Sequence, residues 1–283
     1  MSKIDLLKKE FDKLKQGKEA LLALIDEAEI AESVYNSNAI ENSTLTLKET
    51  EKIIMEMEIS RNISLREVFE AKNLARIFSF IKNNEKKQEL TKDTILFFHK
   101  MLLENINEKI SGRFRSSNEY VRVGTHIGAD PSKIPSLIDE LLLLYSSNNS
   151  IYFLDKIARF HLEFEAIHPF NDGNGRIGRF LINLQLSNLE FPAVVIKNKG
   201  KIEYYMAFNE YNYSKSIKPM LKIINKALAE SLHKRLAYLK GLKIITLPEY
   251  AKLNKLSGSS LFNLAKRQTI PAFREKGIWK IGI

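Results

Sequence analysis

Residues 168–179 read HPFNDGNGRIGR, and both flanking segments can be interpreted from this loop. A helical pattern that reaches Ile167 cannot continue past Pro169, because proline lacks the amide hydrogen and clashes with the preceding turn. Two glycines and an asparagine then allow the backbone to turn tightly, and a second helical pattern begins near Gly175. The stretch therefore predicts a helix, a short loop with exposed backbone N–H groups, and another helix.

Helical patterns continue on both sides of this loop, with apolar residues at three- and four-residue spacing. The longest of them cover residues 20–34, 68–81, 95–103, 134–145, 157–167, 177–189 and 220–239. Only 12 Gly and 7 Pro occur in 283 residues, so few long loops are expected. One interruption, residues 111–124, has two short β-branched and aromatic stretches around a polar turn, which predicts a β-hairpin. The expected fold class is mainly α, a helical bundle with one hairpin.

The composition excludes several classes of protein. The chain is 44% hydrophobic and 28% charged, as expected for a globular protein with a sizeable core. It has no cysteine, which excludes disulfides, thiolate zinc sites and cysteine nucleophiles. No apolar run is long enough to span a bilayer, and Lys3 and Asp5 lie where a signal peptide needs apolar residues. We therefore expect a cytoplasmic protein with no membrane partner.

The positive charge is concentrated near the C-terminus. Residues 240–283 hold nine Lys/Arg and two Glu, a net +7 out of +10 for the whole chain. Such an asymmetry favours a small nucleic-acid-binding module attached to a nearly neutral body. A basic solubilising appendage or a dimerisation element is the alternative interpretation.

The pattern of this C-terminal segment supports the same interpretation. Thr246 and Glu249 form a capping box that opens a helix over about residues 247–254, and a second helix follows the turn at Ser257-Gly258. Pro271 ends it, and residues 273–283 look like a hairpin. Two short helices and a hairpin predict a winged helix-turn-helix that binds DNA. The expected DNA contacts are Ser259, Ser260, Asn263, Lys266 and Arg267 on the second helix and Arg274 and Lys276 on the wing.

Three domains follow from these patterns. Residues 1–60 are N-terminal helices, residues 61–239 a helical core with the helix after it, and residues 240–283 the winged helix-turn-helix. A homodimer is left open.

The loop itself has residues suited to nucleotide chemistry. Amide hydrogens at a helix N-terminus bind anions, and Arg176 and Arg179 lie on one helical face where they can reach phosphate oxygens. Asp172, the only acid in the loop, can hold a Mg²⁺ ion that bridges two phosphates. His168 can take a proton from an attacking hydroxyl. Together these groups indicate transfer from a nucleoside triphosphate.

The loop resembles the signature of the Fic family, H-x-F-x-[D/E]-G-N-G-R-x-x-R, at every fixed position. The resemblance extends over about residues 37–219 and implies the family's helical fold. It also implies transfer of AMP from ATP to a Tyr, Thr or Ser hydroxyl of a target protein, or of the chain itself, with pyrophosphate as the leaving group. It identifies His168 with the general base and Asp172 with the Mg²⁺ ligand. The implied phosphate-binding residues are Gly173, Asn174, Gly175, Arg176 and Arg179.

Two further segments resemble parts of the family's nucleotide and target sites. The predicted hairpin resembles the family's flap, which lines the nucleotide pocket and pairs with the backbone of the target. The flap residues are Val121, Arg122, Val123 and Gly124. Residues expected around the adenine and ribose are Tyr204, Tyr205 and Asn212.

An upstream segment, residues 37–42 (SNAIEN), fits the family's inhibitory pattern [S/T]-x-x-x-E-[G/N]. The resemblance implies that Glu41, with Ser37 before it, pairs with Arg179 and keeps ATP from binding productively. In some family members the same glutamate helps to remove AMP. The chain is thus expected to be an autoinhibited protein adenylyltransferase that can also remove AMP.

Two other functions compete with this one. The chain could be an ATP-sensing, DNA-binding transcription regulator with little transferase activity, although binding alone needs no general base such as His168. The loop could also transfer another phosphate-containing group, or phosphate itself. A metal site at His161, Glu165 and His168, spaced along one helical face, is disfavoured because Pro169 ends that helix. We interpret His161 and His99 as hydrogen-bonded core histidines.

Overall fold

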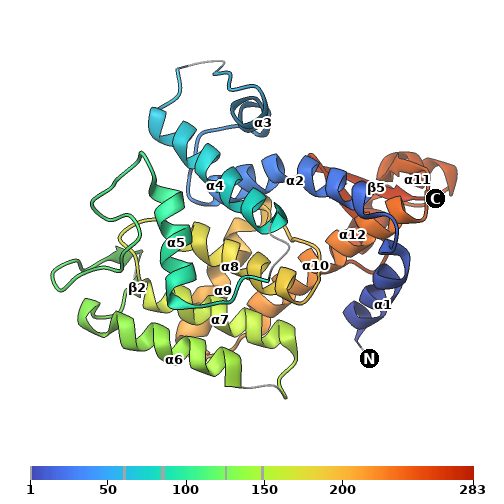
Figure 1. Ribbon diagram of the computed structural model, residues 1–283. Helices are drawn as coiled ribbons and strands as arrows, with labels where there is room; N and C mark the ends of the chain where they lie inside the picture. Colours follow the sequence, from blue (N-terminus) through green and yellow to red (C-terminus); the bar gives the residue numbers. More distant parts are fainter. Residues whose placement is uncertain (1, 60–61, 84–86, 125, 148–149) are drawn as a thin grey trace. The chain divides into compact units, whose positions relative to one another are not determined.

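The computed structural model describes residues 2–59, 62–83, 87–124, 126–147 and 150–283. It is mainly α-helical with few short strands, which confirms the predicted fold class (Figure 1). The chain forms two compact units, one of residues 30–190 and 196–223, the other of residues 1–29, 191–195 and 224–283. The boundaries predicted after residues 60 and 239 do not coincide with this division, because each unit combines segments that are distant in sequence.

The larger unit is a helical bundle built around α8. Its elements are the C-terminal half of α2 (Glu19–Ile40), α3 (Leu47–Met55), α4 (Leu65–Asn83), α5 (Lys92–Leu103), α6 (Ile134–Ser147), α7 (Phe153–Ile167), α8 (Asn174–Asn188) and α9 (Lys201–Ser214), with short 3-10 turns at Pro131–Lys133 and Asn198–Gly200. Helix α8 packs against α4, α5 and α7, and α6 covers α7. Phe98, Phe164 and Phe180 are fully buried in the shared core. Burying such aromatic side chains is a main source of stability.

The β-hairpin of this unit lies later in the chain than predicted. Strand β1 (Arg122–Val123) pairs antiparallel with β2 (His126–Ile127). Residues 113–115, which precede the polar turn and were expected to form the first strand, are not in a strand. Arg115 explains the difference, because it is buried and its backbone N–H donates to the Pro169 carbonyl at 2.9 Å. This segment is held by the loop before α8 rather than by a strand partner.

The smaller unit combines both chain ends. It contains α1 (Lys3–Lys15), the first half of α2, most of α10 (Lys218–Leu239), β3 (Ile244–Thr246), α11 (Leu247–Leu253), α12 (Gly258–Lys266), β4 (Ala272–Glu275) and β5 (Ile278–Gly282). The strands form an antiparallel sheet in the order β3-β5-β4. The capping box of Thr246 and Glu249 begins α11, at the position that the sequence predicts.

The C-terminal segment of the smaller unit has its own small core. Leu247 and Ala251 of α11, Leu261 and Ala265 of α12, and Ile281 of β5 are buried together. Strand β3 was not expected from the sequence, because a three-residue stretch carries too short a pattern to recognise. Within the described ranges, no helix has the length and apolar character needed to cross a membrane.

Candidate active site

The loop between α7 and α8 begins and ends with residues in the left-handed backbone conformation. His168 caps α7 with a φ of 52°, and Gly173 precedes α8 with a φ of 84°. Glycine suits position 173 for two reasons, since a Cβ atom there would be strained and would lie 2.8 Å from a methyl carbon of Leu102. Helix α7 ends at Ile167, where the sequence places its end.

Asn174 closes this loop on itself. Its side-chain oxygen accepts from the Phe170 N–H at 2.9 Å, and its amide nitrogen donates to the Phe170 carbonyl at 2.7 Å. The first hydrogen bond of α8 runs from the Ile177 N–H to the Gly173 carbonyl, so the amides before Ile177 have no partner inside the helix. The geometry suits an anion at the start of α8. The Asn174 side chain thus holds the shape of the loop through its two hydrogen bonds with Phe170.

His168 faces a cavity of about 430 Å³ that lies over this loop. Its side chain is 15% exposed, and burial lowers the pKa of the imidazole to about 4. The ring is therefore neutral at pH 7 and can accept a proton. Arg115 fixes the backbone of His168, because its Nε donates to the His168 carbonyl at 2.8 Å.

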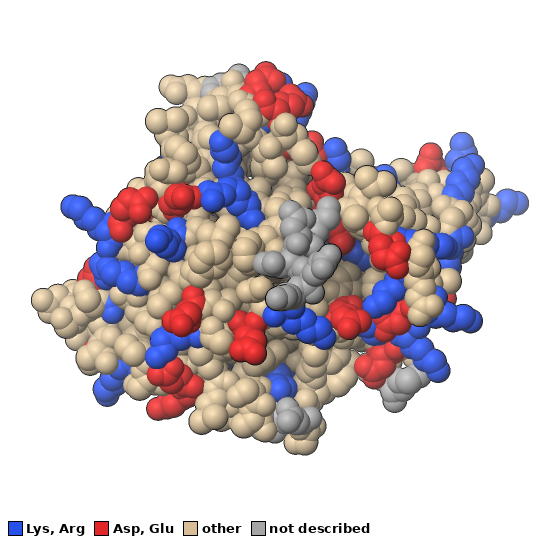
Figure 2. Space-filling model, in the orientation of Figure 1, with Lys and Arg blue, Asp and Glu red and all other residues tan. Residues whose placement is uncertain are grey.

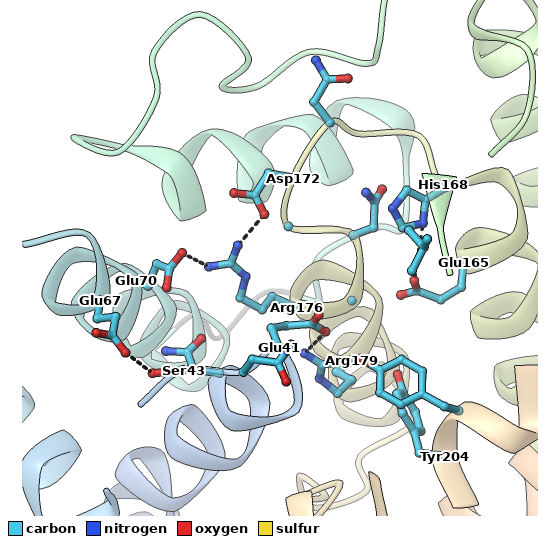
Figure 3. A pocket seen from close by; sticks show the side chains of 18 of the residues that line it. Glu41, Ser43, Glu67, Glu70, Glu165, His168, Asp172, Arg176, Arg179 and Tyr204 are labelled. Carbon is cyan, nitrogen blue, oxygen red and sulfur yellow. Dashed lines mark hydrogen bonds and ion pairs between the residues drawn. The ribbon is translucent and has the colours of Figure 1, made fainter. Parts of the chain in front are cut away.

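Arg176 and Asp172 form a charge network with α4. The guanidinium of Arg176 lies 2.8 Å from Asp172 and 2.9 Å from Glu70 (Figure 3). Arg66 donates to both of these carboxylates. Burial opposes ionisation of Asp172, but Arg176 and Arg66 outweigh it and hold its pKa below the ordinary value. Arg176 is only 4% exposed. Two carboxylates thus compete with any phosphate for this arginine.

Arg179, one turn further along α8, is held by the end of α2. Its Nη2 lies 2.9 Å from Glu41 Oε1, its Nε donates to the Ser37 hydroxyl at 3.0 Å, and Nη2 also donates to the Ser37 carbonyl at 2.8 Å. A methyl group on Gly175 would collide with Glu41 Oε1, which means that this carboxylate rests against the first turn of α8 (Figure 3). The chain's own carboxylate thus lies where the loop suits an anion.

Aromatic residues of α9 form another wall of the cavity. Tyr204 is buried, and its hydroxyl lies 2.7 Å from His161 Nε2, while the Tyr205 hydroxyl donates to the Ile40 carbonyl at 3.2 Å. Both tyrosines, which the sequence analysis expects near the nucleotide, line the cavity. From the hairpin, Val123 lines it as well. The other residues predicted at the nucleotide, Val121, Arg122, Gly124 and Asn212, lie outside the cavity wall as the structure describes it.

Asp172 is suited to a Mg²⁺ ion that is also bound by phosphate oxygens. It is an ionised, half-buried carboxylate on the cavity wall. Mg²⁺ commonly binds one or two carboxylates together with substrate phosphates and waters, so one acid meets the requirement. In the described part of the chain, no group of three or more His, Asp or Glu side chains forms a metal site of protein ligands alone.

Three residues of this site were not identified as functional from the sequence. His99 accepts from the Gly112 N–H at 3.1 Å, donates to the Asp172 carbonyl at 3.0 Å and stacks on Phe170. Arg115 donates to the carbonyl of His168 in the loop and to that of Ala129 after the hairpin, and Glu165 lines the cavity beside His168. The roles of His99 and Arg115 depend on contacts between distant segments, which no local pattern carries. Glu165 is near His168 in sequence and was considered only as a metal ligand.

The residues predicted at a DNA interface mostly lie on one exposed surface. Along α12, Leu261 and Ala265 face the small core. All five residues predicted on this helix and its cap are exposed, Ser259, Ser260, Asn263, Lys266 and Arg267, and so are the apolar Phe262 and Leu264. Lys and Arg side chains project from this segment in Figure 2. Lys276 is exposed in the hairpin turn. Arg274 differs from the prediction, because Glu230 accepts from its Nη2 at 2.6 Å and its guanidinium lies over the Trp279 ring.

Fold and loop together define a class of mainly helical proteins in which a glycine-containing loop leads into a central helix at the wall of a cavity. The Fic/DOC family model matches residues 89–186, which contain α5 to α7 and most of α8. Residues 89–186 therefore match a Fic/DOC domain, which confirms the resemblance that the loop sequence predicts.

Known proteins with the same domain extend the likeness. A protein adenylyltransferase Fic from Nematostella vectensis is 27% identical over 208 residues, 72% of this chain and 48% of that protein. A Fic domain-containing signaling protein from Bacteroides thetaiotaomicron superposes with a TM-score of 0.76 at 26% identity, over 85% of this chain and 97% of that one. Fic-1 from Caenorhabditis elegans superposes with a TM-score of 0.72 at 25% identity, over 82% and 69%. The chain spans about half the length of the curated relatives that it matches.

Proposed function

We propose that this protein transfers AMP from ATP to a hydroxyl group of a target protein. One observation carries the proposal: a single cavity is lined by the neutral His168, the anion-binding loop before α8 and the guanidinium of Arg179. Relatives named protein adenylyltransferase share this domain, which supports the same activity here.

The chemistry follows from the residues on the cavity wall. A target hydroxyl of Tyr, Thr or Ser attacks the α-phosphorus, and the bond from that phosphorus to the oxygen bridging to the β-phosphate breaks. His168 takes the hydroxyl proton, and pyrophosphate leaves. The amides at the start of α8 and the guanidinium of Arg179 hold the β- and γ-phosphates, which fixes the attack geometry. Asp172 would hold a Mg²⁺ ion, whose chemistry is to neutralise charge on the phosphates.

The resting state of this site is inhibited by Glu41. Its carboxylate rests on Gly175 and pairs with Arg179, so it occupies the position proposed for a phosphate. A phosphate must displace Glu41 before Arg179 can bind it. Once AMP has been transferred, the same carboxylate lies close enough to the cavity to orient a water molecule, which supports removal of AMP as a second activity.

Labelling with radioactive ATP tests both parts of this proposal. The Glu41→Gly chain should incorporate label from [α-³²P]ATP, into itself or a target in lysate, at least about tenfold faster than the parent, if the ion pair contributes about 1.4 kcal/mol to the closed state. Glu41→Gln keeps the size of the side chain without its charge and should also label faster. His168→Ala in the Glu41→Gly background should abolish labelling.

The position of the label separates the competing reactions. Incorporation from [γ-³²P]ATP instead of the α-labelled nucleotide would identify phosphate transfer. If neither nucleotide labels any protein in the Glu41→Gly form, transfer by this site is disproved and an ATP-sensing function is favoured.

We also propose that the C-terminal segment binds DNA as a winged helix-turn-helix. The exposed side of α12, with Asn263, Lys266 and Arg267, supports this second function, whereas Arg274 is neutralised by Glu230. Fluorescence anisotropy with duplex DNA from the region upstream of the gene that encodes this chain should show binding whose affinity falls as the salt concentration rises. Lys266→Ala and Arg267→Ala should each reduce the slope of log K against log salt by about one. If the parent chain and both variants bind DNA with the same affinity, this surface is excluded as the DNA-binding site.

A further inference from the structure

Glu165 is a buried carboxylate in the active-site cavity that the proposed chemistry has not used. It lies on α7, one turn before His168, and its side chain is 11% exposed. Its Oε1 atom is buried and has no hydrogen-bond partner among the residues that the structure describes. A side chain at Gly178 would collide with this oxygen, so only glycine allows the carboxyl to lie against α8. An unpartnered carboxyl is costly to bury and therefore calls for a functional reason.

Glu165 lies on the Nδ1 side of the His168 ring (Figure 3). Its Oε2 is 4.0 Å from His168 Nδ1, and its backbone carbonyl accepts a hydrogen bond from the imidazole. The backbone of His168 is fixed by its own N–H bond to the Phe164 carbonyl at 3.0 Å and by Arg115. A small rotation of either side chain would bring the carboxylate and Nδ1 into hydrogen-bond contact.

On these contacts we propose that Glu165 is a positioning residue for His168, holding its Nδ1–H so that Nε2 faces the target hydroxyl, and stabilising the imidazolium that forms. The inference rests on the proposed transfer reaction. During that step the hydroxyl proton moves to Nε2, the proton on Nδ1 stays in place, and Glu165 keeps its negative charge throughout. The ionised form of Glu165 is therefore the active one.

The surroundings of Glu165 determine when it ionises. The titratable and charged groups that face it are Glu41, His161, His168, Arg179, Tyr204 and Tyr205. Burial raises the pKa of Glu165 to about 8, and Glu41 adds to the rise while Arg179 opposes it. In the Glu41→Gly protein the phosphates of bound ATP replace the negative charge of Glu41. His168 titrates far lower, so Glu165 governs the pH dependence between pH 6 and 9.

The pH profile of labelling in the Glu41→Gly background tests the proposal. The rate should rise with pH through the Glu165 titration, and Glu165→Gln, which can still accept from Nδ1 but has no charge, should lose this rise. The labelling rate of the Glu41→Gly chain divided by that of the same chain with Glu165→Gln should grow by more than about tenfold from pH 6 to pH 9. Glu140→Gln, the same change at an exposed site on α6, should leave the profile unchanged. A ratio that stays constant over this range overturns the proposal.

A second measurement does not depend on transfer. The ¹⁵N shifts of the His168 ring, assigned with the His168→Ala protein, should move between pH 6 and 9 in the Glu41→Gly chain with a non-hydrolysable ATP analogue. They should not move in the Glu165→Gln version. Ring shifts that are flat in the first protein, or that still move in the second, reject the role of Glu165 even if labelling is seen. If labelling fails while the shifts behave as expected, the proposed function is wrong and the Glu165–His168 coupling stands.

Discussion

Gly173 begins α8 with a backbone conformation that other residues adopt at a cost. An alanine there would be strained at a φ of 84°, and its methyl group would press on Leu102. We expect Gly173→Ala to lower the free energy of unfolding by about 2 kcal/mol or more, from strain and overpacking together. Gly17→Ala is the matched control, since Gly17 has a φ of 71° and an added methyl group would meet nothing within 4 Å. Thermal unfolding should show a smaller loss for the control, and equal losses would exclude the contact with Leu102.

We expect the stability of the folded chain to depend on pH because the carboxyl of Glu165 is buried. Burial raises its pKa from the ordinary 4.5 to about 8, so the folded chain binds this proton more tightly than the unfolded chain. Its contribution is fully present below pH 4.5 and is lost as the pH rises through 8. Glu165→Gln should therefore unfold at a higher temperature than the parent at pH 9, with the difference shrinking toward pH 5. A difference that does not change with pH would contradict the burial of an ionisable group here.

Among the elements, the start of α4 fixes the loop that follows the inhibitory segment, residues 37–42. Glu67, in the first turn of α4, accepts from the Thr44 N–H at 2.6 Å and from the Ser43 hydroxyl at 3.0 Å. Glu67→Ala removes these contacts, which contribute about 1 kcal/mol, so labelling by the otherwise unchanged chain should rise about fivefold. Combined with Glu41→Gly, the change should have no further effect, because the inhibitory carboxylate is already absent. An equal rise in both backgrounds would show that Glu67 acts on ATP binding instead.

Elements with strong local patterns were predictable from the sequence, whereas elements that depend on distant contacts were not. Pro169 and the loop glycines predict the break between α7 and α8 because they act on the backbone locally. The hairpin was displaced because Arg115 is buried against the loop, which no β-type pattern in residues 113–115 reveals. Glu165 was considered only as a metal ligand, because its spacing from His168 does not reveal that its carboxyl is buried against Gly178 of α8.

At the scale of the whole molecule, the smaller unit depends on charges from both ends of the chain. Arg235 of α10 is 1% exposed and pairs with Glu29 at 2.7 Å and with Asp26, both on α2. Neighbouring Lys234 lies 2.9 Å from Glu29. The two basic groups outweigh burial and hold the pKa of Glu29 below the ordinary 4.5. Residues more than 200 positions apart thus neutralise each other inside one core, which a boundary drawn along the sequence cannot represent.

Removing one partner of this buried cluster should destabilise the protein strongly. Glu29→Ala removes one of the carboxylates that neutralise Arg235 and Lys234. We expect it to lower the free energy of unfolding by about 3 kcal/mol. Glu10→Ala is the control, because Glu10 pairs with Lys240 between the same chain ends but both side chains are at least 40% exposed, so its loss should stay below about 1 kcal/mol. Since the pKa of Glu29 is depressed, its contribution is present at neutral pH and is lost as the pH falls below 4.5. In urea unfolding at pH 7, Glu29→Ala should lose much more free energy of unfolding than Glu10→Ala, and this difference should be smaller at pH 4. Equal losses of free energy at pH 7 would show that the cluster is not buried in solution.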